Sequence, residues 1–453
     1  MNRARTAIFP VIPNRRRFVS LVLVLIPLIT MAGYAAMHFG YYPVRLLQLA
    51  GLARIGTSSS VIQQNEVLPV SPPLSFLLFL LFRNPMLISG LIGAVLIGYL
   101  VYYVTSYPHA PLLKTVLVVY ILFSPSMLLL VLFETEWAAF LTLGFFANYF
   151  VLEFYRQEHS FFLFMCGLCI GAMYLIVPEI LLFIPFLVLG LGFIFRKLGR
   201  TLIYSAVLLF PVLSAALLWP IVEWFISGFF INPFPRFFLP ADVDYIVTSL
   251  RESGAVLAGY VILAILSLRT GSAMFRPAYA ILGVPLLLLI NGLLWLRPVP
   301  IIVQVPLIMV NVVILYPYLD MMLPRPILRT VVIALAVVAF ISGTRTLIRP
   351  PDSFRAEVSA VVRGEDGNVA EFNLIAEQIE HGDVLFVPGS VHLAWLMSHI
   401  PTESLHYQRF TSQAVPEEVR WIVLDLPTHE PSGISGFIER FRTDHYRVLE
   451  RRL

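Results

Sequence analysis

Over its first 350 residues, the chain alternates between long apolar runs and short polar segments. A transmembrane helix needs about 20 consecutive, mostly apolar residues, and about eleven runs meet or approach this length. The pattern therefore predicts a mainly α-helical, multi-pass membrane domain over residues 1–349. The expected spans lie near 18–38, 85–106, 112–133, 136–153, 159–178, 180–195, 201–228, 254–268, 277–296, 299–320 and 328–346.

Two long intervals between these spans are expected to be loops on the non-cytoplasmic side, at about 39–84 and 229–253. The first contains a Pro-Pro step and then the apolar run 74–82, which is too short to cross a membrane. Such a run suits a helix that lies in the membrane interface. The second is rich in proline and aromatic residues between Phe229 and Pro240, which favours an irregular segment lying on the membrane.

The pattern changes near residue 350, where charged residues become frequent and the periodicity shortens. Residues 351–453 carry sixteen of the 27 acidic residues of the chain. Strands that alternate with helices predict a small α/β domain with a partly parallel sheet at 350–453. We expect helices near 369–381, 391–399 and 433–442, and strands near 383–388, 404–410, 421–426 and 445–451. No glycine-rich nucleotide-binding motif is present in the sequence.

Composition agrees with a membrane protein and argues against nucleic-acid binding. Hydrophobic residues make up 58% of the chain and charged residues only 13%, whereas soluble proteins carry about 25% charged residues. The formal net charge is only +4, and the basic residues lie mainly between apolar runs. Basic residues in that position set the orientation of a membrane protein.

The distribution of basic residues predicts a cytoplasmic N-terminus. With that orientation, fourteen Lys and Arg residues fall on the cytoplasmic side and eight in outer segments of the first 350 residues. An odd number of spans then places the C-terminal α/β domain outside the cytoplasm, on the far side of the plasma membrane. The arginine-rich start precedes an apolar run, Phe18–Gly40, that is too long for a signal peptide, so we expect an uncleaved first span.

Acidic residues are expensive at membrane depth and are usually functional or paired. The first 350 residues contain only eleven, and most of them map to the outer side in this topology. The eight outer ones are Glu66, Glu134, Glu136, Glu179, Glu223, Asp242, Asp244 and Glu252. Their one-sided placement predicts that any chemistry takes place at the non-cytoplasmic face.

Three short motifs, in this order, resemble the GT-C superfamily of membrane glycosyltransferases, which includes protein O-mannosyltransferases and aminoarabinose transferases. They are the Pro-Pro element within 71–76, the Ser-Pro step at 124–126 that leads to Glu134 and Glu136, and the glycine-containing helix before Pro178-Glu179. The outer α/β domain is also similar. One departure is that no acidic residue comes soon after the first span, where family members commonly have one. Either Glu66 fills that role from a later position, or the protein is a degenerate member.

The resemblance implies that a sugar moves from a polyprenyl-phosphate donor to a lipid, glycan or protein acceptor in the cell envelope. This transfer needs a carboxylate that takes a proton from the acceptor hydroxyl, and Glu66 is the candidate base. Glu134 and Glu136 are candidates for positioning the acceptor or sharing a divalent cation. No metal-ligand spacing is recognisable, and the pair Cys166 and Cys169 suits helix packing better than metal or redox chemistry.

Guanidinium groups suit phosphate oxygens, so the candidate partners of the lipid phosphate are Arg83, Arg236 and Arg251.

Each of these assignments has a structural alternative. Glu134 and Glu136 begin a helix, where acidic groups favourably meet the helix dipole. Glu66 is alternatively a solvated loop residue, and the arginines are alternatively interfacial anchors. The missing acidic residue therefore keeps a second hypothesis open: a non-catalytic membrane scaffold, or an accessory subunit of an envelope or membrane complex. A transporter is disfavoured, because the sequence shows no convincing internal repeat.

Overall fold

A computed structural model of the chain describes the helices, the strands and some of the connections between them. The described residues are 15–38, 44–56, 84–106, 110–177, 198–227, 254–263, 301–322, 324–348, 368–379, 381–387, 390–407, 415–425, 436–443 and 446–452, with isolated positions 74, 78, 180, 181, 184, 185 and 188. The chain divides into two compact units. The helical unit comprises Met1–Thr30, Ser89–Leu217 and Asn232–Pro351, and the mixed unit comprises Met31–Ile88, Leu218–Ile231 and Asp352–Leu453.

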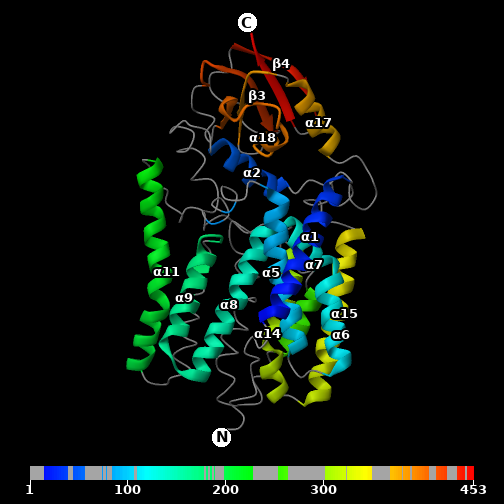
Figure 1. The fold of residues 1–453 in the computed structure, drawn as a ribbon, viewed down its shortest axis with the longest axis vertical. Coiled ribbons are helices and arrows are strands. Elements are labelled where there is room, and N and C mark those ends of the chain that lie inside the picture. Colours follow the sequence, from blue (N-terminus) through cyan, green and yellow to red (C-terminus); the bar gives the residue numbers. More distant parts are fainter. Residues whose placement is uncertain are drawn as a thin grey trace. The chain divides into compact units, whose positions relative to one another are not determined.

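Long helices account for most of the described residues before position 350 (Figure 1). They are α1 (Arg15–His38), α2 (Val44–Gly56), α5 (Pro85–Ser106), α6 (Pro111–Phe123), α7 (Pro125–Phe133), α8 (Thr135–Gln157), α9 (Ser160–Tyr174), α11 (Leu198–Ser227), α14 (Ile301–Met322) and α15 (Arg325–Ile348). A further apolar helix covers Gly254–Leu263.

Four described helices are long and apolar enough to cross a membrane. They are Arg16–His38, Pro85–Ser106, Gly199–Val222 and Arg325–Ile348, and the bent pair α6 and α7 makes a fifth if it counts as one span. The chain is therefore a helical membrane protein. The expectation of eleven spans is not confirmed. The apolar helices Ser160–Tyr174, Gly254–Leu263 and Val303–Tyr316 are shorter than a span, and the run near 277–296 and most of 180–195 lie outside the described residues.

The expected span at 112–133 is two helices that meet at a bend of 41°. Ser124 separates them with extended backbone angles, φ −65° and ψ 127°. Proline lacks an amide hydrogen and disfavours helical angles in the residue before it, so Pro125 ends α6 and begins α7. Gly343 of α15 lies against the start of α7, since a Cβ on Gly343 would lie 2.8 Å from the Ser126 nitrogen.

Small residues bring α9 and α11 close together. A Cβ on Gly167 would lie 2.2 Å from the Leu208 carbonyl oxygen, and one on Gly171 would lie 3.1 Å from the Pro211 oxygen. This four-residue spacing of glycines is a common helix-packing device in membranes. Cys166, beside Gly167, is buried, and both Cys166 and Cys169 are free thiols. Helix packing thus accounts for the small residues of α9.

Burial differs sharply between the helices of the helical unit. The described side chains of α14 are almost all buried, including the polar Gln304 and Asn311. In contrast, α1 and α11 expose large apolar side chains, with Leu23 62% and Phe210 65% exposed. A helix that contacts lipid exposes apolar side chains to it. The exposed apolar side chains of α1 and α11 therefore suit contact with lipid.

The C-terminal part of the mixed unit contains one five-stranded sheet of order β2-β1-β3-β5-β4. Its strands are β1 (Asp383–Phe386), β2 (Leu405–Tyr407), β3 (Val419–Asp425), β4 (Phe437–Arg442) and β5 (Tyr446–Arg451). β1 pairs in parallel with β2 and β3, whereas β5 pairs antiparallel with β3 and β4. The helices beside it are α17 (Asn368–Gln378) and the short α18 (Leu393–Leu396), with a 3₁₀ turn at Thr402–Ser404. The expected partly parallel sheet is confirmed.

One local expectation for the α/β domain was wrong. The helix expected near 433–442 is instead strand β4, which forms a hairpin with β5. Two contacts join the strands of this hairpin: Glu439 pairs with Arg447, and the Arg451 guanidinium group stacks on the Phe437 ring. The interval 39–84 between the first two expected spans includes the short helix α2, and most of its other residues lie outside the described ones.

Apolar side chains cover both faces of the sheet. On one face, Phe372 of α17 lies edge-on to Tyr446 and tilted against the buried His392. The other face carries a buried cluster of Leu385, Val387, Val419, Ile422, Leu424 and Leu449. This two-sided burial fits the central parallel strands β1 and β3, because a parallel sheet needs cover on both faces.

Candidate functional site

The residues proposed from the sequence fall into two groups. Glu66 and the three arginines, Arg83, Arg236 and Arg251, lie outside the described residues. Glu134 and Glu136 are described, and both lie where α7 ends and α8 begins. The structure therefore provides the geometry around Glu134 and Glu136, and it does not describe the surroundings of Glu66 or of the three arginines.

Glu134 connects the two helices through its backbone. Its amide donates to the Leu130 carbonyl oxygen over 3.0 Å, which closes α7, and its own carbonyl accepts from the Ala138 amide over 2.9 Å, which opens α8. Its angles, φ −115° and ψ 53°, are not helical. The half-buried side chain makes no capping hydrogen bond to α8, so helix capping does not explain the carboxylate of Glu134.

Glu136 lies in the first turn of α8 and is half-buried. Its Oε1 atom is inaccessible to solvent, between the buried residues Thr135 and Trp137 in the sequence. Removal of a charged oxygen from water is unfavourable, and the N-terminal position in α8 offsets part of that cost through the helix dipole. The junction thus holds two partly buried carboxylates within three consecutive residues.

A cluster of hydroxyl groups lies at the other end of α7. The Ser124 and Ser126 Oγ atoms are 2.8 Å apart, and the Tyr120 hydroxyl lies 3.4 Å from Ser126 Oγ. All three side chains are buried. The nine residues of α7 separate this cluster from Glu134 by about 13 Å at the usual helical rise. The Ser-Pro step therefore contributes no side chain to the acidic junction.

The mixed unit contains a second polar arrangement, around Arg54 of α2. Arg54 Nη1 donates to the carbonyl oxygens of Ala394 and Met397 over 2.6 and 2.9 Å, and Nη2 donates to Ile400 over 2.6 Å. Burial lowers the pKa of the Arg54 guanidinium from its ordinary value. The sequence gives no sign of this contact, because segment 390–400 contains no acidic partner for Arg54.

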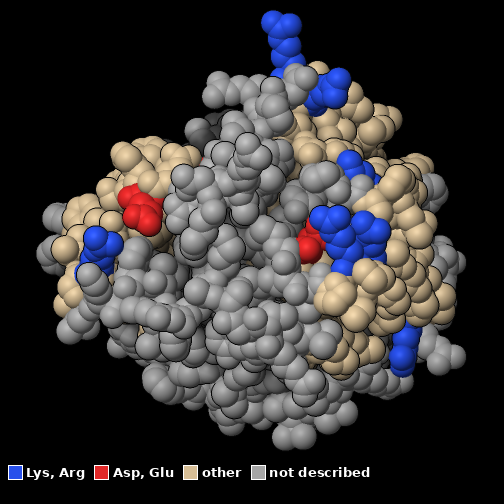
Figure 2. All heavy atoms as spheres, turned by 90° about the horizontal axis from the view of Figure 1, so that it is seen from below, with Lys and Arg blue, Asp and Glu red and all other residues tan. Residues whose placement is uncertain are grey.

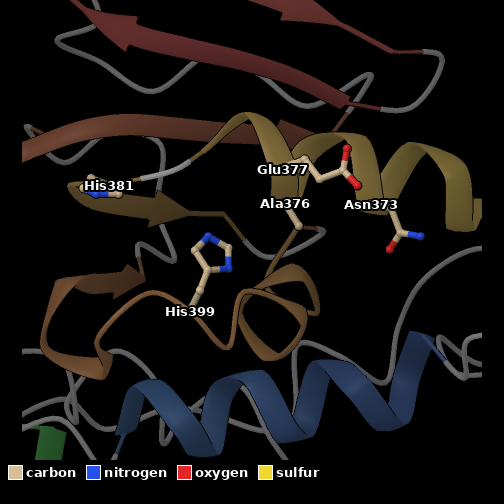
Figure 3. A pocket seen from close by; sticks show the side chains of 5 residues that line it. All are labelled: Asn373, Ala376, Glu377, His381 and His399. Atoms are coloured by element: carbon tan, nitrogen blue, oxygen red, sulfur yellow. The ribbon is translucent and has the colours of Figure 1, made fainter.

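A shallow hollow of about 370 Å³ lies beside α17 in the α/β domain (Figure 3). Asn373, Ala376 and Glu377 of α17 line it together with His381 and His399. His399 Nε2 lies 2.9 Å from the Ile379 carbonyl oxygen, where it donates a hydrogen bond, and this contact fixes the ring. Asparagine, glutamate and histidine groups around an open hollow can form hydrogen bonds with a polar ligand.

Among the described residues, no group of three or more His, Cys, Asp or Glu side chains could hold a metal ion. Figure 2 views one end of the molecule, where the described surface carries scattered basic side chains with acidic ones beside some of them. One such pair of opposite charges is Asp320, near the end of α14, and Arg325, the first residue of α15. Their Oδ1 and Nε atoms lie 3.6 Å apart.

The described helices and sheet define a helical membrane protein with a small α/β domain. Comparisons with protein-family models, with curated proteins and with solved structures gave no match. The residues and their geometry therefore carry the functional argument.

Proposed function

We propose that the protein is a membrane glycosyltransferase that moves a sugar from a polyprenyl-phosphate donor to an acceptor at the non-cytoplasmic face of the plasma membrane. The observation that carries the proposal is the α7–α8 junction, where two partly buried carboxylates flank Thr135 in a helical membrane protein. Acidic groups at such positions are usually functional. The acceptor is a lipid, a glycan or a protein.

The proposed reaction divides the work among three sets of residues. The Glu66 carboxylate takes the proton of the acceptor hydroxyl as its oxygen attacks the anomeric carbon, and the bond from that carbon to the phosphate oxygen breaks. Arg83, Arg236 and Arg251 stabilise the departing polyprenyl phosphate. Glu134 and Glu136 orient the acceptor, alone or through a divalent cation.

The first test is consumption of donor by the purified wild-type protein in lipid nanodiscs, with labelled polyprenyl-phosphate sugars as substrates. Glu66→Gln is expected to abolish transfer, and Glu136→Gln is expected to lower it at least about tenfold, because loss of a positioned group commonly costs that much. Glu158→Gln is the matched control, since Glu158 is exposed just after the opposite end of α8. Wild-type protein that consumes no donor refutes the proposal.

A non-catalytic scaffold is the second candidate, and α2 favours it. This helix of the first outer segment is almost wholly buried, and Arg54 binds three main-chain carbonyls. Such contacts suit a structural element, and no residue of α2 is acidic. If the scaffold hypothesis holds, all the glutamate variants retain the biological activity of the wild type and still purify with the same partner proteins.

A further inference from the structure

Helix α2 comes soon after the first candidate span, yet it is too short to cross a membrane itself. It has 13 residues, or about 20 Å at the usual rise, whereas the hydrocarbon core of a bilayer is about 30 Å thick. Its apolar side chains are nonetheless buried, since Leu47, Leu49 and Ile55 are at most 1% exposed. The partners that cover α2 therefore decide on which face of the membrane it lies.

Those partners belong to the C-terminal α/β domain. Within the mixed unit, α2 packs against α18, β2 and the 3₁₀ turn that precedes β2 (Figure 1). The backbones approach closely, because a Cβ on Gly51 would lie only 2.2 Å from the Val391 carbonyl oxygen. A carbon atom and an oxygen atom do not come so near each other. The absence of a side chain at Gly51 therefore permits the contact.

Arg54, one turn further along α2, adds hydrogen bonds to the same segment. Its Nη1 atom donates to the carbonyl oxygens of Ala394 and Met397, and its Nη2 atom donates to that of Ile400. The last carbonyls of a helix have no partner within it, and a planar guanidinium group can bind several acceptors at once. Close packing and directed hydrogen bonds thus both attach α2 to segment 390–400.

The domain that receives α2 has the properties of a domain outside the bilayer. Residues 351–453 carry sixteen of the 27 acidic residues of the chain. The residues of β4 are exposed or half-buried, and the side chain of Arg440 is 61% exposed. The sheet is open, and backbone groups at the edge of an open sheet cannot face hydrocarbon. Because α2 is part of the core of this domain, α2 also lies outside the bilayer.

We infer that α2 and the C-terminal α/β domain form one two-part domain on a single face of the membrane. Arg16–His38 is long and apolar enough to cross the membrane before α2, so the N-terminus lies on the opposite face. The chain then crosses the membrane an even number of times between Gly56 and the α/β domain, and an odd number of times in total. This inference is independent of the proposed function.

The inference restricts the number of spans in a way that hydropathy does not. Ten of the eleven runs expected to cross follow α2, which is an even number. Three apolar helices among them, Ser160–Tyr174, Gly254–Leu263 and Val303–Tyr316, are shorter than a span, so hydropathy alone does not decide whether each one crosses. With α2 and the domain on one face, the runs that do not cross are even in number. A single failure is excluded.

The first experiment compares the two ends of the full-length protein in sealed membrane vesicles of one orientation. Gly436→Cys supplies a thiol at an exposed position, where an added Cβ would meet no heavy atom within 4 Å. An epitope tag before Met1 marks the other end. A membrane-impermeant maleimide tests access to the thiol, and an added protease tests access to the tag. The wild type, whose Cys166 and Cys169 lie in α9, gives the background labelling.

One of the two markers should be accessible in sealed vesicles, and the other only after permeabilisation. The wild type should remain at background in both states. If both markers are accessible before permeabilisation, or if both need it, the N-terminus and the C-terminal domain share a face. The chain then crosses an even number of times in total, and the inference is wrong.

The second experiment tests the α2 contact by amide hydrogen exchange in the full-length protein. Gly51→Ala adds the obstructing carbon, and Arg54→Met keeps an apolar stem but removes the donors. In both variants, exchange should accelerate at least about tenfold in 44–56 and in 390–400. The central strands β3 and β5 should stay protected, because the change is confined to the contact.

The matched control variants are Gly436→Ala, at the open position already described, and Arg442→Met, at an exposed position of β4. Both should exchange as the wild type does. Unchanged exchange in 44–56 and 390–400 for Gly51→Ala and Arg54→Met overturns the two-part domain, even where the two ends lie on opposite faces. If Arg54→Met does not accumulate, Arg54→Lys keeps the charge without the planar fork and provides the same comparison.

Discussion

The close packing of α9 against α11 can be tested by giving Gly167 a side chain. A Cβ at this position would lie 2.2 Å from the Leu208 carbonyl oxygen, whereas carbon and oxygen atoms normally stay about 3.4 Å or more apart. The two helices must therefore separate by about 1.2 Å, or the Leu208 peptide must rotate. Overpacking of this kind costs about 1–3 kcal/mol, and separation also weakens the packing that drives helix association in lipid.

The intrinsic preference of alanine for helices acts in the opposite direction. Alanine in place of glycine within a helix stabilises it by about 0.5–1 kcal/mol. The net change for Gly167→Ala is then a destabilisation of up to about 2 kcal/mol. At Gly171 an added Cβ would lie 3.1 Å from the Pro211 carbonyl oxygen, so Gly171→Ala should change the stability little. At Gly144 the nearest atom is 3.5 Å away, and at Gly199 nothing lies within 4 Å, so both should gain stability.

The assay is reversible unfolding of the purified protein in mixed micelles, with increasing denaturing detergent and far-ultraviolet circular dichroism as the signal. Stability should be lowest for Gly167→Ala, intermediate for Gly171→Ala and highest for Gly144→Ala and Gly199→Ala. This order follows from whether the added Cβ would clash, touch or meet open space. If Gly167→Ala is as stable as Gly199→Ala, α9 and α11 do not pack through this glycine.

Three further predictions concern single positions. Glu158 has left-handed backbone angles, with φ 53°, so Glu158→Gly should stabilise the α8–α9 connection by about 1 kcal/mol, as measured by the same detergent unfolding. The buried Ser390 hydroxyl donates to the Val423 carbonyl over 2.8 Å and accepts from the Val387 amide over 3.2 Å, so Ser390→Ala should destabilise the α/β domain by about 1–3 kcal/mol. Thermal unfolding followed by tryptophan fluorescence should show this loss. A periplasmic reporter enzyme fused after Leu453 should be active if the C-terminal domain is extracytoplasmic, and inactive if the number of spans is even.

The sequence predicted long helices well where hydrophobicity and backbone chemistry agree. The apolar run 85–106 is the helix Pro85–Ser106, because a proline can begin a helix and nothing interrupts the run. The run 112–133 is equally apolar but contains Pro125, whose backbone divides it into α6 and α7. A hydropathy window records side chains only, and therefore cannot detect that break.

Strand β4 shows a different limit, because tertiary pairing overrides local preference. The segment from Phe437 to Arg442 has charged residues at helical spacing, and in isolation it fits a helix. In the structure, its position beside β5 supplies backbone partners along the segment and places Glu439 next to Arg447. Local sequence does not contain that information, since β5 begins only after the turn that joins the two strands.

The acidic junction could be located from sequence, since two glutamates interrupt an apolar stretch between two expected spans. The partial burial of Glu136 and the lack of a capping role for Glu134 could not, because they depend on how α7 and α8 meet. A charge on an apolar helix indicates where chemistry can take place. Its surroundings then decide whether the charge is solvated, paired or held for a substrate.

Arg54 shows why a long-range contact can leave no sequence signal. Searches for charge pairs look for an acidic partner, and segment 390–400 has none. The acceptors are main-chain carbonyls, which every residue carries, so the contact places no requirement on the side chains of Ala394, Met397 or Ile400 beyond their packing. The requirement falls entirely on the donor and on Gly51, which permits the approach. Two unremarkable residues of α2 thus join parts of the chain some 340 positions apart.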